Sequence, residues 1–162
     1  MEPDLCDVRD GGVSMEQKQR KKHRLPRDCY QGGDAFFITI CATRDGVSLV
    51  DDPLKAVLVR FLESQLDIND GPVHAYVIMP DHLHLVIGGV DDAVKWTGWF
   101  KARVSFFAKK QGFAGQLWQR SFYDQGIRKP EKSMEIFQYM RNNPVEAGLV
   151  GHADQWTLKY GC

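Results

Sequence analysis

The sequence predicts an α+β fold in which helices pack on an antiparallel sheet. Segments rich in β-branched and aromatic residues alternate with segments whose apolar residues recur at helical spacing. The expected order is strand, helix, strand, strand, helix, strand, helix, which favours an α+β sandwich. Two of the strands are separated only by Pro80 and Asp81, so they form a hairpin or a bent, closely connected pair.

The strands are predicted from β-rich runs bounded by turn residues. Residues 35–43 (AFFITICAT) lie between a Gly-Gly pair and an Asp-Gly turn, which indicates a buried strand. Residues 73–79 (VHAYVIM) and 82–87 (HLHLVI) are two further strands. Residues 117–127 are aromatic-rich and expected to be extended.

Three helices are predicted from periodicity and from residues that begin or end helices. The first starts at Asp52-Pro53 and extends to Asp67. The second covers 91–110, with an aspartate at its N-terminus. The third opens at Pro130 and ends at Asn143, because Pro144 disfavours helix continuation. In the second helix an apolar stripe is expected from five aromatic residues, Trp96, Trp99, Phe100, Phe106 and Phe107.

The composition is that of one ordinary globular domain. The chain has 162 residues, of which 43% are apolar and 11% aromatic. It has no apolar run of about 18 residues, the length associated with a membrane-spanning helix. The opening MEPDLCDVRD is acidic and lacks the features of a secretory signal. We therefore expect a cytoplasmic protein without a membrane segment.

The charge is balanced overall but uneven along the chain. Lysine and arginine number 21, as do aspartate and glutamate. Residues 1–17 are mainly acidic, whereas 18–27 contain basic residues and no acidic ones. We expect 1–23 to be a disordered arm, 24–150 to be the domain and 151–162 to be a short tail. The basic part of the arm either follows a phosphate backbone or is simply solvated.

Two histidines flank a leucine in the strand at 82–87. Because side chains alternate across a strand, His82 and His84 share one face, while Leu83 and Leu85 point to the core. Two such imidazoles are half of a divalent metal site, or they occupy the wet face of the strand. His74 is a possible third ligand, but a surface position is the favoured interpretation.

A tyrosine lies on the apolar stripe of the third predicted helix. Ile136, Tyr139, Met140 and Asn143 follow one another at helical spacing, which puts Tyr139 at the edge of the stripe. It is either a core residue with its hydroxyl at the rim or a nucleophile. A nucleophilic role requires a nearby cation, because the ordinary pKa of tyrosine is about 10.

Asn143, one turn further along the same helix, carries a neutral carbonyl oxygen. Together with His82 and His84 it would make a mixed nitrogen and oxygen set with open positions, which suits Mn²⁺ or Mg²⁺. The alternative is that this asparagine ends the helix by bonding its own backbone. Spacing does not separate the two.

Three motifs resemble one known family. VIMPDHLHLVI (77–87), LWQRSFYDQGIR (117–128) and YMRNNPVEAGLV (139–150) are similar to segments of REP-associated tyrosine transposases, which are single-tyrosine HUH transposases. The stretch from Arg24 to Ile40 resembles the opening strand of that family. The four segments occur in the expected order. The tail, HADQWTLKYGC, only loosely resembles the usual Trp-Pro-Ser stretch.

The resemblance implies a ferredoxin-like or RRM-like fold and assigns roles to residues. His82 and His84 match the metal-binding pair, and Tyr139 matches the nucleophile. Asn143 matches the place of the third ligand, where related transposases have glutamine. The implied cofactor is Mg²⁺ or Mn²⁺, and a homodimer is possible because related enzymes place the tyrosine in cis or in trans.

The implied activity is cleavage and rejoining of one DNA strand through a 5′-phosphotyrosine link. The implied partner is single-stranded or hairpin DNA. The candidate DNA-contacting residues are Arg24, Arg27, Lys101, Lys109, Trp118 and Arg120. Two alternatives remain open, a hairpin-binding module that does not cut and a metal-dependent phosphodiesterase that uses activated water.

Overall fold

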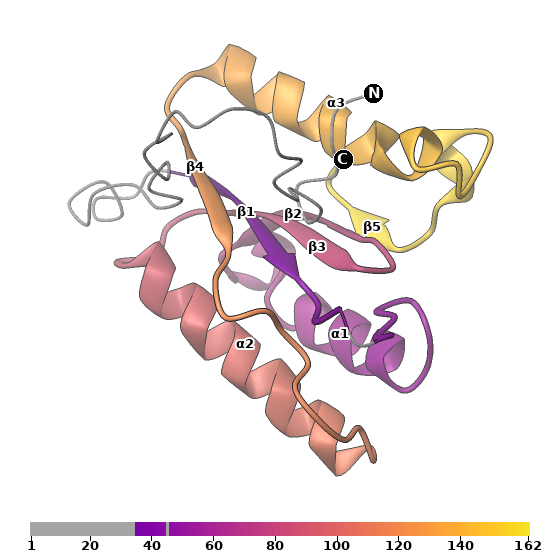
Figure 1. The fold of residues 1–162 in the computed structure, drawn as a ribbon. Coiled ribbons are helices and arrows are strands. Elements are labelled where there is room, and N and C mark those ends of the chain that lie inside the picture. The colour runs from indigo at the N-terminus through magenta and orange to yellow at the C-terminus, as the bar shows by residue number, and fades with distance from the viewer. Residues whose placement is uncertain (1–34, 45) are drawn as a thin grey trace, which may run out of the picture.

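The computed structural model describes residues 35–44 and 46–162, which form a five-stranded antiparallel sheet with helices on both faces (Figure 1). The strand order is β4-β1-β3-β2-β5, and the predicted α+β class is confirmed. The strands are β1 (Ala35–Cys41), β2 (Val73–Ile78), β3 (His82–Ile87), β4 (Tyr123–Ile127) and β5 (Lys159–Tyr160). The helices are α1 (Leu54–Glu63), α2 (Ala93–Lys110), α3 (Pro130–Glu146) and the 3₁₀ turns η2 (Asp67–Asn69) and η3 (Ala153–Gln155).

β2 and β3 form a hairpin, which decides between the two predicted arrangements of this strand pair. Their register pairs Ile78 with Leu83 and Val77 with His84, and it shifts at an irregularity between Val73 and Ala75. β3 then pairs with β1 along its whole length. The longest strands therefore lie at the centre of the sheet, with β4 and the two-residue β5 at its edges.

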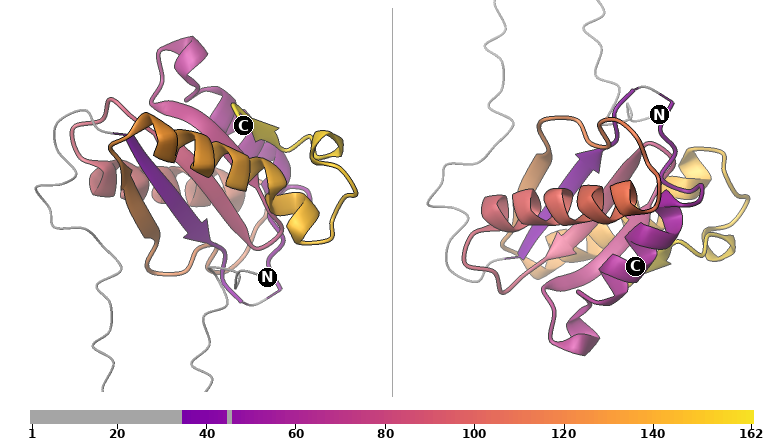
Figure 2. Two further views of the ribbon diagram at one scale, coloured as in Figure 1. Left: turned by 90° about the horizontal axis from the view of Figure 1, so that it is seen from above. Right: turned by 90° about the horizontal axis from the view of Figure 1, so that it is seen from below.

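The sheet lies between α3 on one side and α1 and α2 on the other (Figure 2). An apolar layer fills each side. Alternate residues of each strand point to opposite faces, so one set packs with α1 and α2 and the other with α3. Leu83 and Leu85 belong to the first layer, as predicted. Val77, Val86 and Met140 belong to the second. Because α3 covers this second face of the sheet, the strand side chains of this layer are buried.

α2 begins as predicted, but its aromatic stripe differs from the prediction. The Asp92 carboxylate caps the helix by accepting from the N–H groups of Val94 and Lys95, each at 3.0 Å. The buried stripe consists of Ala93, Thr97, Phe100, Val104 and Ala108, while Trp99 and Phe106 are exposed. No helix in the described ranges is both long and apolar enough to cross a membrane.

α3 continues past the predicted end at Asn143. It runs to Glu146 with Pro144 inside it and buried. Proline donates no hydrogen bond and its ring crowds the carbonyl one turn earlier, but the next turn is intact because Ala147 N–H donates to the Asn143 carbonyl at 2.9 Å. The prediction was wrong because burial of the proline ring favours continuation. Asn143 is therefore a helical residue and not a cap.

Residues 151–162 return to the sheet after α3. β5 pairs with β2, with Tyr160 opposite Tyr76 and Lys159 opposite Val77. The indole N–H of Trp156 donates to the Ile78 carbonyl at 3.1 Å. The segment expected to be a tail therefore covers the outer edge of β2, and a two-residue strand is too short for sequence periodicity to reveal.

Candidate metal and tyrosine site

His82 and His84 lie at the start of β3, on the face that α3 covers. As the alternation of the strand predicts, both imidazoles share that face, and their Nε2 atoms are 3.0 Å apart. The wet-face interpretation is wrong, because the two residues are 3% and 0% exposed. The helix and the neighbouring aromatic rings remove them from solvent.

A chain of three hydrogen bonds runs through the histidine pair. His82 Nδ1 lies 2.7 Å from the Asp81 carboxylate, and His84 Nδ1 lies 2.8 Å from the Thr39 hydroxyl. A carboxylate only accepts, so His82 Nδ1 carries a proton and its Nε2 accepts from His84 Nε2–H. His84 Nδ1 then accepts from Thr39 O–H. With His82 neutral, this assignment of tautomers satisfies every nitrogen in the pair.

Burial keeps His84 neutral. It lowers the pKa of His84 well below 6.5, and charge on His82 lowers the pKa further. At pH 7 the imidazole of His84 is therefore neutral, which is the form that binds metal ions.

The pair has the arrangement expected of metal-binding histidines. Each Nδ1 is held by an oxygen of an outer partner, Asp81 or Thr39, while both Nε2 atoms converge. To present two lone pairs, His84 must move its proton from Nε2 to Nδ1, and the Thr39 oxygen can accept that proton in a hydrogen bond. The residues present therefore fit a divalent cation.

Asn143 is the third ligand that the family resemblance implies, and it offers a neutral oxygen. Asn143 Oδ1 is buried and has no hydrogen-bond partner, which is unusual for an amide oxygen and is the state that a bound cation would relieve. Within the described ranges no three His, Cys, Asp or Glu side chains gather as a potential ion site. His74 is exposed and bonds Asp67, with Nδ1 3.2 Å from the carboxylate, so its predicted surface position is confirmed.

Tyr139 projects from α3 onto the histidine pair. Its ring meets the His84 imidazole edge to face, with centroids 5.5 Å apart, and lies 6.1 Å from the Phe37 ring. The Phe37 ring also stacks on the His84 imidazole, with ring centroids 5.1 Å apart. The three rings form one cluster between β1, β3 and α3. Tyr139 is half-buried, so part of its side chain reaches the surface.

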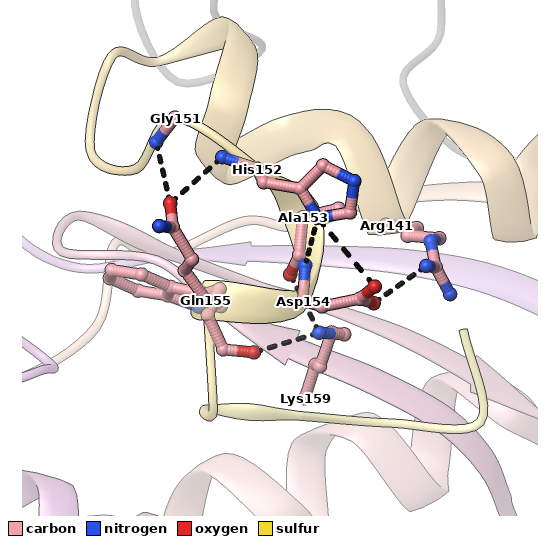
Figure 3. Close-up of polar contacts among 8 residues, drawn as sticks. Arg141, Gly151, His152, Ala153, Asp154, Gln155 and Lys159 are labelled. Atoms are coloured by element: carbon pink, nitrogen blue, oxygen red, sulfur yellow. Dashed lines mark hydrogen bonds and ion pairs between the residues drawn. The ribbon is translucent and has the colours of Figure 1, made fainter.

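Polar contacts within the C-terminal segment, and one to Arg141 of α3, are drawn in Figure 3. Arg141, which lies between Tyr139 and Asn143 in the sequence, pairs with Asp154 at 2.6 Å. The Gln155 side chain accepts from two backbone N–H groups, those of Gly151 and His152, at 2.9 Å each. Lys159 Nζ bonds the carbonyls of Ala153 and Trp156 at 2.8 Å each. No sequence signal pointed to these contacts.

The predicted DNA-contacting residues do not join the cluster. Lys101 Nζ bonds three backbone carbonyls of the segment before β4, those of Gln119, Arg120 and Ser121. Trp118 is 4% exposed and part of the core that packs with α1 and α2. Lys109 and Arg120 are exposed. α2, which carries both lysines, lies on the opposite side of the sheet from α3 (Figure 2). The N-terminal arm, Arg24 and Arg27 lie outside the described residues.

Known proteins share this architecture. The solved structure of a REP-associated tyrosine transposase bound to a REP hairpin matches with a TM-score of 0.64 over 84% of this chain and 81% of that chain, at 22% identity. The chain has the fold of that transposase. The resemblance predicted from the motifs is therefore confirmed at the level of the fold, which by itself does not fix the chemistry.

Two further comparisons give matches at similar sequence identity. An uncharacterised protein of Haemophilus influenzae is 23% identical over 168 residues, which cover 78% of this chain and 88% of that protein. A candidate transposase from Deinococcus radiodurans matches with a TM-score of 0.47 over 74% of this chain and 96% of that chain, at 21% identity, too low a score to support an argument. No protein-family model matches the sequence.

Proposed function

We propose that this protein is a tyrosine transposase that cuts one strand of DNA and rejoins it through a 5′-phosphotyrosine link. The observation that carries the proposal is the contact between Tyr139 and His84, whose Nε2 converges with that of His82. A phenol and two imidazoles gathered on one face of the sheet suit phosphoryl transfer. The shared fold with a hairpin-bound transposase supports DNA as the substrate.

In the proposed reaction the Tyr139 oxygen attacks the phosphorus of a single-stranded segment. A bond forms between this oxygen and phosphorus as the phenol gives up its proton, and the bond from phosphorus to the 3′-oxygen breaks. The 3′-oxygen leaves as a hydroxyl, so the net step moves the phenol proton to it. The strand downstream stays on the enzyme as a 5′-phosphotyrosine. A 3′-hydroxyl can reverse the step, so rejoining needs no ATP, because the phosphodiester energy is retained.

The residues that would hold a divalent cation are His82, His84 and Asn143. Mg²⁺ or Mn²⁺ bound there would neutralise charge on the oxygens of the scissile phosphate. The protein's own contribution is positional. Burial keeps His84 neutral, Thr39 and Asp81 orient the imidazoles, and the Arg141–Asp154 ion pair links α3 to residues 151–162.

A second candidate function is hairpin binding without cleavage. It is favoured by one specific observation, which is that hydrogen bonds to Thr39, to Asp81 and between the rings satisfy the histidine pair. A descendant that had lost catalysis could keep this network for stability alone. The orphaned Asn143 oxygen is the feature that this candidate leaves unexplained.

The test is a denaturing gel that detects a covalent protein–DNA adduct. Wild-type protein is mixed with Mn²⁺ and single-stranded DNA bearing hairpins from the flanks of its own gene. Tyr139→Phe is the test variant, and Tyr123→Phe is the matched control, because Tyr123 pairs with Thr39 on the same face of the sheet. We expect adduct with wild type and Tyr123→Phe only.

The other outcomes separate the candidates. Adduct that persists in Tyr139→Phe would refute the assignment of the nucleophile. Binding without adduct in any variant would favour the hairpin-binding candidate. Release of a free 5′-phosphate without adduct would indicate hydrolysis by activated water.

A further inference from the structure

The outer surface of α2 carries aromatic and basic side chains in alternation. Trp99 is 44% exposed and Phe106 is 49% exposed, although both are large and apolar. Basic residues precede, separate and follow them at helical spacing, so that all lie along one side of the helix. We call this set the α2 stripe, and its members are Lys95, Trp99, Arg103, Phe106, Lys109 and Lys110, all of them exposed.

The charge of α2 is one-sided. The helix contains five basic residues and no acidic residue, in a chain whose basic and acidic residues are equal at 21 each. One of the five, Lys101, is used to bond backbone carbonyls. The other four belong to the α2 stripe, which therefore concentrates positive charge that the balanced composition conceals.

Trp99 and Phe106 each pack against neighbouring side chains. Trp99 packs on Phe61 of α1, with ring centroids 5.5 Å apart, and on Trp96 at 6.2 Å. The ammonium of Lys110 lies 4.7 Å from the centre of the Phe106 ring. A ring that is already ordered loses little conformational freedom when a second planar group stacks on it. Exposure together with this support is what a stacking platform requires.

We propose that the α2 stripe is a second DNA-contacting surface that binds an unpaired strand. Bases would stack on Trp99 and Phe106, and phosphates would meet the four cations, a combination that fits single-stranded nucleic acid irrespective of sequence. The two rings are seven residues apart, about 10 Å along the helix, so they contact different nucleotides. The choice of DNA rests on the proposed function.

The α2 stripe and Tyr139 lie on opposite sides of the sheet. α2 packs on one face of the sheet and α3 on the other, as Figure 2 shows in its two views. A strand on the α2 stripe therefore leaves the histidine and tyrosine cluster free. It holds DNA that flanks the segment to be cut.

A second copy of this chain and a membrane surface fit the α2 stripe less well than an unpaired DNA strand does. In a symmetric dimer built on this face, the four cations of one copy would meet the same four of the other, which is repulsive. A membrane surface favours a continuous apolar face, whereas here a charged residue separates the exposed rings, Trp99 and Phe106. A polyanion with planar bases satisfies both the rings and the charges.

The test measures fluorescence anisotropy of a labelled oligothymidylate in the presence of EDTA. The double variant Trp99→Ala, Phe106→Ala removes both rings, and Ile68→Ala is the matched control because Ile68 is an exposed apolar residue on η2, at 76%. We expect the Kd to rise roughly tenfold or more in the double variant and to stay unchanged in the control. Thermal unfolding checks that the exposed substitutions leave the fold intact.

A second measurement tests the charges. The variant Lys109→Gln, Lys110→Gln should reduce the slope of log Kd against log salt by about 0.7 for each lysine removed. Lys132→Gln on α3 should leave the slope unchanged.

Three results would overturn the proposal. The first is equal affinity in wild type and the double variant. The second is binding to vesicles of phosphatidylcholine and phosphatidylglycerol that requires Trp99 while oligothymidylate binding does not. The third is self-association that Trp99→Ala abolishes. Because EDTA removes the divalent ions, this test does not depend on whether Tyr139 cuts DNA, and an absent adduct would leave its outcome unaffected.

Discussion

The ring of Tyr139 meets the imidazole of His84 edge to face, with centroids 5.5 Å apart and planes inclined at 63°. This contact joins α3 to the centre of the sheet. The position of the phenol therefore also depends on the residues that orient His84. The main one is Thr39, whose hydroxyl lies 2.8 Å from His84 Nδ1. The properties of the site are therefore testable through residues that touch no substrate.

Thr39→Val removes the hydroxyl that satisfies His84 Nδ1 and preserves the volume of the side chain. We expect a loss of about 1–3 kcal/mol in the free energy of unfolding, because a buried nitrogen loses its partner. Mn²⁺ affinity should also fall, since the imidazole is no longer oriented. Urea denaturation and titration calorimetry measure the two effects.

Thr97→Val is the control for that change. Thr97 is equally buried, but it lies on α2 and its hydroxyl bonds the Ala93 carbonyl of its own helix at 2.7 Å. This variant should leave Mn²⁺ affinity unchanged. Equal Mn²⁺ affinity in wild type and Thr39→Val would show that the threonine does not position a ligand.

Asn143→Ala removes a buried oxygen that has no hydrogen-bond partner. In EDTA we expect the melting temperature to be unchanged or higher, because no bond is lost and an unpaired polar atom is removed. Adding Mn²⁺ should raise the melting temperature of the wild type, by linkage of binding to folding, and raise that of the variant less.

Asn142→Ala is the matched control, being the neighbouring half-buried asparagine of the same helix. It should keep the full response to Mn²⁺. If Asn143→Ala responded to Mn²⁺ as the wild type does, Asn143 would not be a ligand.

The Cys162 thiol provides a test of how firmly residues 151–162 are packed. Burial raises the pKa of Cys162 from 9.0 to about 11, against small opposing effects of Lys159 and Arg141. Between these values the unfolded chain releases the thiol proton and the folded chain keeps it. This contribution to stability is therefore present below pH 9 and is lost as the pH rises toward 11.

Alkylation by iodoacetamide, followed by mass spectrometry of the C-terminal peptide, measures this thiol. Just below pH 9 we expect Cys162 to react far more slowly in the native protein than in urea, because the thiolate is the nucleophile. Equal rates in the two states would mean that the segment does not shield Cys162.

The sequence was sufficient to predict the central part of the fold. The β-rich runs, the Asp92 cap and the shared face of His82 and His84 follow from short-range periodicity and capping, and the structure contains all of them. These features are local, so they can be read without knowing which elements pack together.

The environment of the site could not be predicted in the same way. Periodicity places both imidazoles on one face, but whether that face is wet depends on α3, which folds over it from about 50 residues further along the chain. The same holds for Pro144, which continues the helix because its ring is buried, and for β5, whose two residues carry no pattern. Long-range packing decided each of these outcomes.

The most direct test of the central proposal is to locate the DNA link on the protein. After reaction with hairpin-bearing single-stranded DNA and digestion by nuclease and trypsin, mass spectrometry would be used to find the peptide that carries a nucleotide. Residues 133–141 form a tryptic peptide in which Tyr139 is the sole tyrosine. We expect the added nucleotide mass on that residue, whereas a nucleotide on any other peptide, or cleaved DNA with none attached, would contradict the proposal.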